Sequence, residues 1–111
     1  MVKGVWIFEV PEEKQEEYLK VTVEIIKPFW ERRGCLSYQV FQDYTNPLQF
    51  VKEQVYPDKE SLDRDIASAQ DAKDPQAVKV VNLFRSYAQN VVRRLCLPLI
   101  DERGLVVNQS K

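Results

Sequence analysis

Apolar residues recur along the chain with two periods, one of about two residues and one of about 3.6, which are typical of strands and helices respectively. Alternating segments rich in β-branched and aromatic residues predict strands at 3–10, 35–43, 48–56 and 90–100. Helical spacing predicts a long helix at 12–33 and a second helical region at about 59–68 and from 75 onward. The order of elements is therefore β-α-β-β-α-β.

This order is typical of the ferredoxin-like α+β fold, an antiparallel sheet of four strands with helices on one face. In that topology the first and third strands lie in the centre of the sheet, and the second and fourth lie at its edges. Cys35 and Cys96 fall on the two edge strands, so a disulfide between them is not expected. Both cysteines are interpreted as small buried hydrophobic residues.

Residues that interrupt or cap helices mark the boundaries within the pattern. Pro28 predicts a kink near Glu24–Pro28, because proline removes a backbone hydrogen bond from the long helix. Gly34 is a natural left-handed cap after that helix, and Asp74 can cap a further helix that begins at Pro75. The apolar positions of the long helix form two neighbouring rows: Leu19, Val23, Ile26 and Trp30, beside Tyr18, Thr22, Ile25 and Phe29.

The chain has 111 residues, which is the length of one domain. We expect this domain to comprise residues 1–100 and to be followed by a polar C-terminal tail at 101–111. Within the tail, the apolar residues 105–107 could add a segment at the edge of the sheet.

The predicted sheet carries apolar side chains on both faces, although its own helices can cover only one of them. In the first strand Val5 and Ile7 point to one face, whereas Trp6 and Phe8 point to the other. Apolar area left in water costs roughly 25 cal/mol per Å², and a large exposed apolar patch is unusual on a monomer. We therefore expect a homodimer in which two sheets pack face to face.

Composition and charge exclude several classes of function. The formal net charge is −1 and basic residues do not cluster, so a nucleic-acid partner is not expected. No apolar run reaches the about 20 residues that span a bilayer, and the N-terminal segment lacks a signal peptide's apolar core, so we expect no membrane partner and a cytoplasmic protein. The chain has no histidine and no CxxC spacing, which argues against a metal site.

The segment from Pro28 to about Ser68 contains an ordered series of features. It has a proline near the helix end, a Gly-Cys pair, an aromatic strand, an Asn-Pro turn, a glutamate in the third strand and Glu-Ser-Leu opening the next helix, and it begins PFWERRGCLSYQVFQDYTNPLQFVKEQVYPDKESL. In this series the chain resembles the antibiotic biosynthesis monooxygenase superfamily of dimeric α/β barrels. The resemblance implies a homodimer whose two sheets form a barrel, with a pocket between the sheet and the helices of each subunit.

Members of this superfamily with known activity oxidise aromatic polyketides or quinols without a cofactor, or degrade haem. Their third strand often reads Glu-x-Trp, and the following helix often carries a histidine. Here Glu53 fits the pattern, whereas Val55 stands at the tryptophan position and Asp65 at the histidine position. Haem degradation needs an axial histidine, so the resemblance implies a reaction without a cofactor.

Glu53 and Asp65 are the candidate catalytic residues. We place Glu53 on the helix-facing side with Val51 and Val55, where burial would raise the pKa of its carboxyl group and let it accept a proton. A structural ion pair between Glu53 and an arginine such as Arg64 is the alternative. Asp65 could act as the base at the mouth of the pocket, or it could be a solvated residue of the helix.

The other candidate residues would form the walls of a pocket for a small aromatic ligand. They are Trp6, Trp30, Tyr38, Val55, Tyr56, Arg64 and Phe84. Aromatic residues at these spacings also suit a plain hydrophobic core. One of Arg93 and Arg94 must face inward or across the dimer, where it could hold a substrate carboxylate or phenolate or form an ion pair between subunits.

Two functions remain open at this point. One is a cofactor-independent monooxygenase that acts on a small aromatic or quinol-type substrate, with Glu53 or Asp65 removing a proton. The other is a homodimer without catalytic activity, which binds a small ligand or has a structural role. Fold alone does not decide between them.

Overall fold

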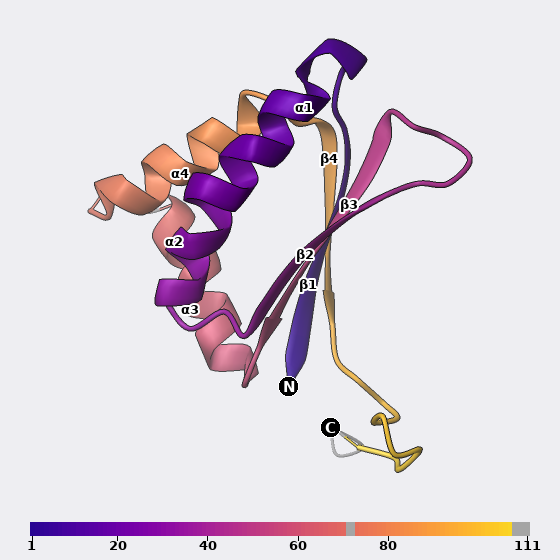
Figure 1. Ribbon diagram of the computed structural model, residues 1–111. Coiled ribbons are helices and arrows are strands. Elements are labelled where there is room, and N and C mark those ends of the chain that lie inside the picture. The colour runs from indigo at the N-terminus through magenta and orange to yellow at the C-terminus, as the bar shows by residue number, and fades with distance from the viewer. Residues whose placement is uncertain (71–72, 108–111) are drawn as a thin grey trace.

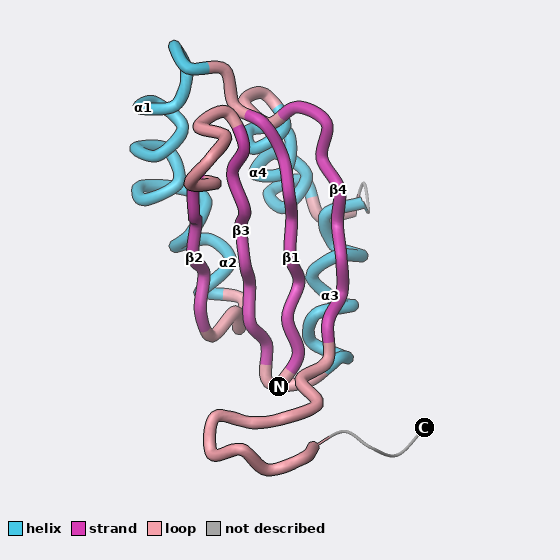
Figure 2. The backbone as a smooth tube through the Cα atoms, turned by 90° about the vertical axis from the view of Figure 1, so that its right-hand side faces the viewer, coloured by secondary structure: helices cyan, strands magenta, loops and turns pink. Residues whose placement is uncertain are grey.

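The computed structural model describes residues 1–70 and 73–107, in which four strands form one antiparallel sheet (Figure 1). The strands are β1 (Val2–Glu9), β2 (Ser37–Gln42), β3 (Gln49–Tyr56) and β4 (Gln89–Cys96). Their order across the sheet is β2-β3-β1-β4 (Figure 2). This order confirms the predicted ferredoxin-like α+β topology, with β1 and β3 in the centre.

The helices of the described residues cover one face of this sheet (Figure 1). They are α1 (Glu12–Val21), η1 (Thr22–Ile26), α2 (Lys27–Arg32), α3 (Lys59–Gln70) and α4 (Pro75–Arg85). The first three follow one another without a break, and η1 is a π-helical segment. Pro28 is the second residue of α2, close to the end of η1, where its missing N–H and its ring disturb the regular hydrogen-bond ladder. The predicted kink is therefore a π-helical segment.

The buried face of α1 and η1 includes only part of the two predicted rows. Tyr18, Thr22 and Ile26 are buried, whereas Leu19 is 45% exposed and Val23 is 67% exposed. The hydroxyl of Thr22 donates a hydrogen bond of 2.8 Å to the backbone carbonyl of Tyr18, which satisfies this polar group on the buried face. The buried side chains therefore come from both predicted rows, because Ile26 belongs to the row of Leu19, and Ile25 in the row of Tyr18 is 47% exposed.

The register between β1 and β3 decides which side chains face the helices. Phe8 pairs with Phe50, and both are buried under the helices. The ring of Phe8 meets Tyr18 edge-on at 5.8 Å and Phe84 edge-on at 5.0 Å, which is a favourable geometry for aromatic pairs. The core of the subunit is thus an aromatic cluster between the sheet, α1 and α4.

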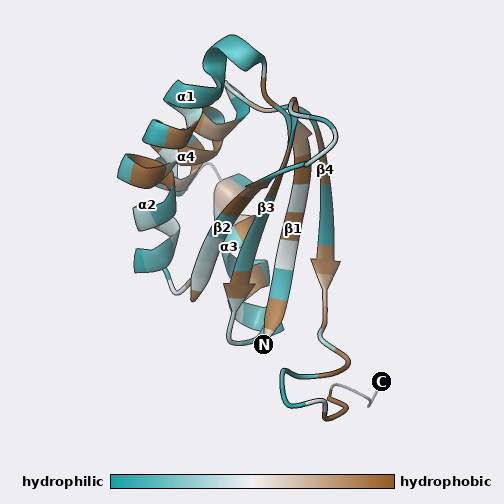
Figure 3. Ribbon diagram, turned by 45° about the vertical axis from the view of Figure 1, so that its right-hand side comes forward, coloured by the Kyte–Doolittle hydropathy of each residue, from teal (hydrophilic) through white to brown (hydrophobic). Residues whose placement is uncertain are grey.

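The opposite face of the sheet carries no helix among the described residues (Figure 3). Strand alternation and register place these apolar residues on it: Val5, Ile7, Phe41, Val51, Val55, Val92 and Cys96. Cys96 is exposed there, so its interpretation as a buried residue was wrong, whereas Cys35 is buried as expected. The two thiols are free and belong to opposite edges of the sheet.

The chain after β4 differs from the predicted strand and polar tail. β4 ends at Cys96, and residues 99–107 form a short hairpin instead of continuing to residue 100 as a strand. The N–H of Val107 donates to the carbonyl of Leu99 at 2.8 Å, and Ile100 bridges Val106. The apolar segment 105–107 therefore pairs within the hairpin rather than with the sheet, and the division of the chain after residue 100 stays a prediction.

Arg33 and Asp74 join the end of α2 to the start of α4. The Arg33 guanidinium donates to both carboxylate oxygens of Asp74, at 2.6 and 3.0 Å. Asp74 also accepts from the N–H of Ala77, which confirms its predicted role as the cap of α4. Gly34, with a φ of 109°, follows α2 in the predicted left-handed conformation.

Asp74→Ala is expected to lower the free energy of unfolding by more than a substitution at an ordinary surface residue does, because it removes a helix cap and a two-point ion pair. Arg33 holds the pKa of Asp74 below its ordinary value of 3.8, so this stabilisation is present above that pH and is lost as the pH falls. Urea unfolding measures the loss. Glu31→Ala, which removes the exposed pair with Lys27, is the control and should cost about 0.5 kcal/mol or less.

Candidate functional site

A cavity of about 590 Å³ lies between the sheet and the helices. Its size is that of a pocket for a small organic ligand. Strands β1, β3 and β4 form one wall, and α2, α3 and α4 form the others. Four aromatic residues line it: Trp6, Trp30, Tyr56 and Phe84. The cavity therefore lies where the sequence predicted it, between the sheet and helices of one subunit.

Trp6 reaches the cavity because its neighbour in the strand has no side chain. A Cβ atom at Gly4 would lie 2.6 Å from two ring atoms of Trp6, so the indole ring lies flat over the backbone of Gly4. Only glycine leaves this space in β1. The ring of Trp6 also lies beneath the ammonium group of Lys52, which is 4.4 Å from its centroid.

Lys52 projects from the centre of β3 into this aromatic environment. Its residue is 4% exposed, and the Nζ atom lies 4.1 Å from the ring centroid of Phe84 and 5.4 Å from that of Tyr38. The ammonium group of Lys52 forms no hydrogen bond or ion pair with the described residues. Burial lowers the pKa of the Lys52 ammonium group from 10.5 to about 7.

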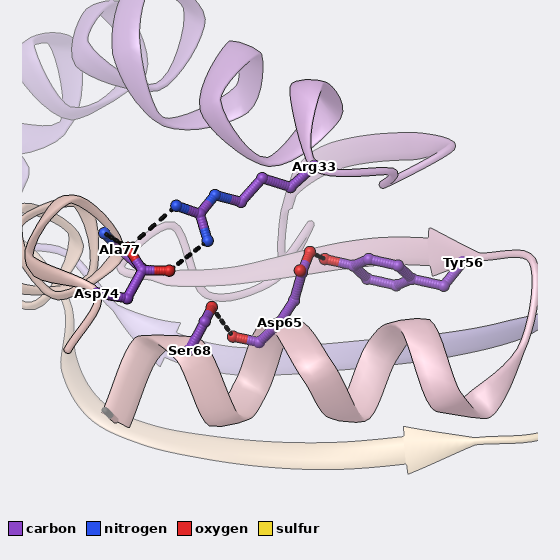
Figure 4. A network of polar contacts seen from close by, with 6 residues as sticks. All are labelled: Arg33, Tyr56, Asp65, Ser68, Asp74 and Ala77. Carbon is purple, nitrogen blue, oxygen red and sulfur yellow. Dashed lines mark hydrogen bonds and ion pairs between the residues drawn. The ribbon is translucent and has the colours of Figure 1, made fainter. Parts of the chain in front are cut away.

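Asp65 lines the same cavity from α3, and a short chain of hydrogen bonds orients it (Figure 4). The Tyr56 hydroxyl donates to Oδ2 of Asp65 at 2.7 Å, and the side-chain amide of Gln54 donates to the Tyr56 hydroxyl at 3.0 Å. Burial raises the pKa of the Asp65 carboxyl group, and the hydrogen bond from Tyr56 partly opposes this. The Oδ1 atom accepts no hydrogen bond from the described residues, so it can receive a proton from a ligand.

The structure brings some of the predicted site residues together and separates others. Trp6, Trp30, Tyr56, Asp65 and Phe84 line the cavity. Tyr38 is buried in the core beside Lys52 and lies outside the lining. Val55 belongs to the open face of the sheet, and Arg64 is exposed on α3.

Glu53 does not face the helices. The helix-facing residues of β3 are Phe50, Lys52, Gln54 and Tyr56, which are all buried. Glu53 lies on the open face instead, where its carboxylate pairs with Lys3 at 3.0 Å. Its predicted orientation was therefore wrong, and the expected partner Arg64 is replaced by Lys3. The catalytic role of Glu53 stays a prediction that no longer has burial beside the helices to support it.

Sequence reasoning missed two polar residues of the site, Lys52 and Gln54. Both alternate along β3 with Glu53 and Val55, which were predicted to face the helices. The prediction therefore assigned Lys52 and Gln54 to the open face. The signal that could have found them is the apolar partner across the strand pair. Lys52 pairs with Trp6 and Tyr56 pairs with Val2, and these β1 residues pack toward the helices.

Comparison with known proteins shows which family the chain matches. The family model described as antibiotic biosynthesis monooxygenase matches residues 1–70, which include the first three strands, α3 and most of the cavity residues. The chain belongs to the antibiotic biosynthesis monooxygenase family. The resemblance seen in the segment after Pro28 is thereby confirmed, and it extends back to the first strand.

Solved structures show the same fold at low sequence identity. A crystal structure of an antibiotic biosynthesis monooxygenase is 21% identical with a TM-score of 0.65, and the match covers 88% of this chain and 98% of that one. The cofactor-independent oxygenase SnoaB from Streptomyces nogalater is 15% identical with a TM-score of 0.70, and the match covers 91% of this chain and 95% of that one. A NIPSNAP family protein from Agrobacterium tumefaciens is 18% identical with a TM-score of 0.66, over 87% and 91% of the two chains.

Three further findings concern this family member. No curated protein sequence matches the chain. Within the described residues, each helix is too short or too polar to cross a bilayer. The same residues contain no group of three or more acidic, cysteine or histidine side chains that could hold a metal ion.

Proposed function

We propose that the protein is a cofactor-independent monooxygenase that oxidises a small aromatic or quinol-type substrate bound between its sheet and its helices. The observation that carries this proposal is an aromatic cavity of about 590 Å³ whose wall contains a buried, oriented carboxylate with one free oxygen atom. Membership in the antibiotic biosynthesis monooxygenase family supports the same reaction class.

The aromatic side chains of the cavity suit a planar substrate. Trp6, Trp30 and Phe84 offer ring faces and edges against which an aromatic ligand packs. Exclusion of water by these rings strengthens the interaction between the substrate and the polar groups of the wall. The cavity therefore binds the ring and leaves its hydroxyl groups to Asp65 and its neighbours.

The proposed reaction needs no reductant besides the substrate. A quinol and O₂ give a hydroxyquinone and water, so one oxygen atom enters the ring and the other leaves as water. The quinol supplies the electrons, and removal of its hydroxyl protons makes the ring a better electron donor. We propose Asp65 as an acceptor of such a proton, because Tyr56 fixes Oδ2 and leaves Oδ1 free.

Asp65→Asn is expected to lower kcat for oxygen consumption by about 10²- to 10⁴-fold, since an amide cannot accept the proton. Oxygen uptake with a panel of quinols measures this. The raised pKa of Asp65 predicts that activity increases with pH as this carboxyl group ionises. Asp63→Asn removes an exposed carboxylate from the same helix and is the matched control.

The same assay separates the alternatives. No oxygen uptake with any quinol, together with tight binding of the same compounds, would favour the ligand-binding protein without catalytic activity. Full turnover by Asp65→Asn would remove this residue from the reaction. Loss of turnover in Glu53→Gln would support the predicted catalytic role of Glu53 and would mean that the open face of the sheet contributes to the site.

We also propose that the protein is a homodimer through the open face of the sheet. Ile7 and Val51 pair across the centre of that face, and Val92 flanks them on β4. None of these three side chains packs under a helix, so a second copy would remove their apolar area from water.

A further inference from the structure

Lys52 is the least expected group in the cavity, because a buried ammonium ion normally has an anionic partner. The rings of Phe84, Trp6 and Tyr38 surround it, with centroids at 4.1 to 5.4 Å from Nζ. Ring faces stabilise a cation, but less than a carboxylate partner in hydrogen-bond contact does. The side chain lies 4% exposed on the cavity wall, so the site has a place for an anion and no protein group that fills it.

The charges around the cavity point to the same kind of ligand. Its lining contains three basic residues, Lys52, Arg85 and Arg93, against one acidic residue, Asp65. The nearby Cys35 and Tyr38 stay uncharged at neutral pH, because burial raises the pKa of each. Tyr56 is also neutral, and its hydroxyl donates a hydrogen bond to Asp65. The cavity is therefore basic as a whole, and Arg85 and Arg93, both exposed, lie where it meets the solvent.

We propose that Lys52 binds the acidic hydroxyl group of a phenol or enol ligand, takes its proton and holds the resulting oxyanion inside the cavity. The O–H bond of the ligand breaks and an N–H bond forms on the unprotonated amine of Lys52. Where Lys52 already carries its proton, the proton of the ligand passes to the solvent, and the same ion pair results. This inference rests on the proposed function for the place and the ring of the ligand, but not on its reaction with oxygen. It narrows the substrates to aromatics with an ionisable hydroxyl group.

The chemistry of the amine suits both parts of this role. With a pKa lowered to about 7, the amine of Lys52 is partly unprotonated at neutral pH and can accept a proton. Once protonated, it forms a charge-assisted hydrogen bond to the oxyanion in an environment that excludes water, where such bonds are strong. The aromatic walls hold the ring of the same ligand.

4-Nitrophenol is a direct probe, because its phenolate absorbs visible light and its neutral phenol does not. At a pH below the probe's own pKa, the wild-type protein is expected to bind it and to produce the phenolate band. Lys52→Met should bind it at least about tenfold more weakly and without that band, which corresponds to the loss of one hydrogen bond to a charged group. Lys20→Met, which removes an exposed lysine of α1, should behave like the wild type.

A matched ligand isolates the proton. 4-Nitroanisole has the same ring and no acidic hydrogen, so we expect wild type and Lys52→Met to bind it with similar affinity. A wild-type complex that holds 4-nitrophenol in its neutral form would overturn the proposal without any variant. Equal affinity of wild type and Lys52→Met for 4-nitrophenol would overturn it as well. A phenolate band without oxygen uptake from quinols would refute the proposed oxygenase and leave this binding site standing.

Discussion

Lys52→Met is expected to stabilise the folded subunit at neutral pH while it removes the binding of acidic phenols. Burial lowers the pKa of the Lys52 ammonium group from 10.5 to about 7, and at roughly 1.4 kcal/mol per pKa unit this sets an upper limit of about 5 kcal/mol on the gain. In the wild type, contacts with the rings of Trp6 and Phe84 offset part of the cost of burying the ammonium group. Methionine has a similar length and packs well against rings. Urea unfolding measures the difference.

The pH dependence provides the sharper test of this prediction. Between pH 7 and 10.5 the unfolded chain binds more protons at Lys52 than the folded subunit does, so stability should rise with pH across this window. Below pH 7, Lys52 is protonated in both the folded and the unfolded state, and the full free-energy cost of burying its charge remains. Lys52→Met should lack this rise, and the difference between the two curves cancels other titrating groups. Parallel curves would show that Lys52 is not desolvated as described, and Lys20→Met should follow the wild type.

A stabilising substitution in a functional cavity has a physical meaning. A protein keeps a costly buried group when the group acts in binding or catalysis, so stability and function are expected to oppose each other at Lys52. The Asp74 and Arg33 pair is the opposite case. Its charges satisfy each other and cap a helix, so its removal should cost stability and leave the cavity unchanged.

The topology of the fold could be predicted from the sequence because its signals are local. Alternation marked the strands, Pro28 marked an irregularity within the long helix, Gly34 marked its end, and Asp74 marked the start of α4. The order β-α-β-β-α-β then leaves few arrangements of the sheet. The hairpin at 99–107 was not predicted, because its apolar residues pair with one another and not with the sheet.

The direction of β3 could not be predicted from its own residues. One side of the strand carries Phe50, Lys52, Gln54 and Tyr56, and the other carries Val51, Glu53 and Val55, so each side mixes polar and apolar groups. Alternation alone therefore does not indicate which side of β3 faces the helices. The pairing of β3 with Trp6 and Phe8 of β1 decides this. The aromatic residues of the cavity were easier to find. Large rings on helix-facing positions are buried wherever the fold is correct, as Trp30 and Phe84 show.

The open face of the sheet leads to the second large effect. Ile7→Glu is expected to convert a homodimer into single subunits at micromolar concentration, because it places one unpaired charge from each copy in the centre of the contact. Ile7 lies directly opposite Val51 and Val92, so the new carboxylate would stand between two apolar side chains. We expect the dissociation constant to rise by at least about 100-fold, which corresponds to about 3 kcal/mol. Light scattering and sedimentation measure the mass.

A matched control separates loss of the contact from loss of the fold. Val23→Glu introduces the same charge at an apolar residue that is 67% exposed on the outer side of η1, and it should leave the mass of the wild type unchanged. Because Ile7 lies outside the helix-covered core, Ile7→Glu should keep the far-ultraviolet circular dichroism of the wild type. A wild-type mass of one subunit would contradict the dimer itself. A dimeric Ile7→Glu would show that copies associate through another surface, and the apolar residues of β1, β3 and β4 would then need a different partner.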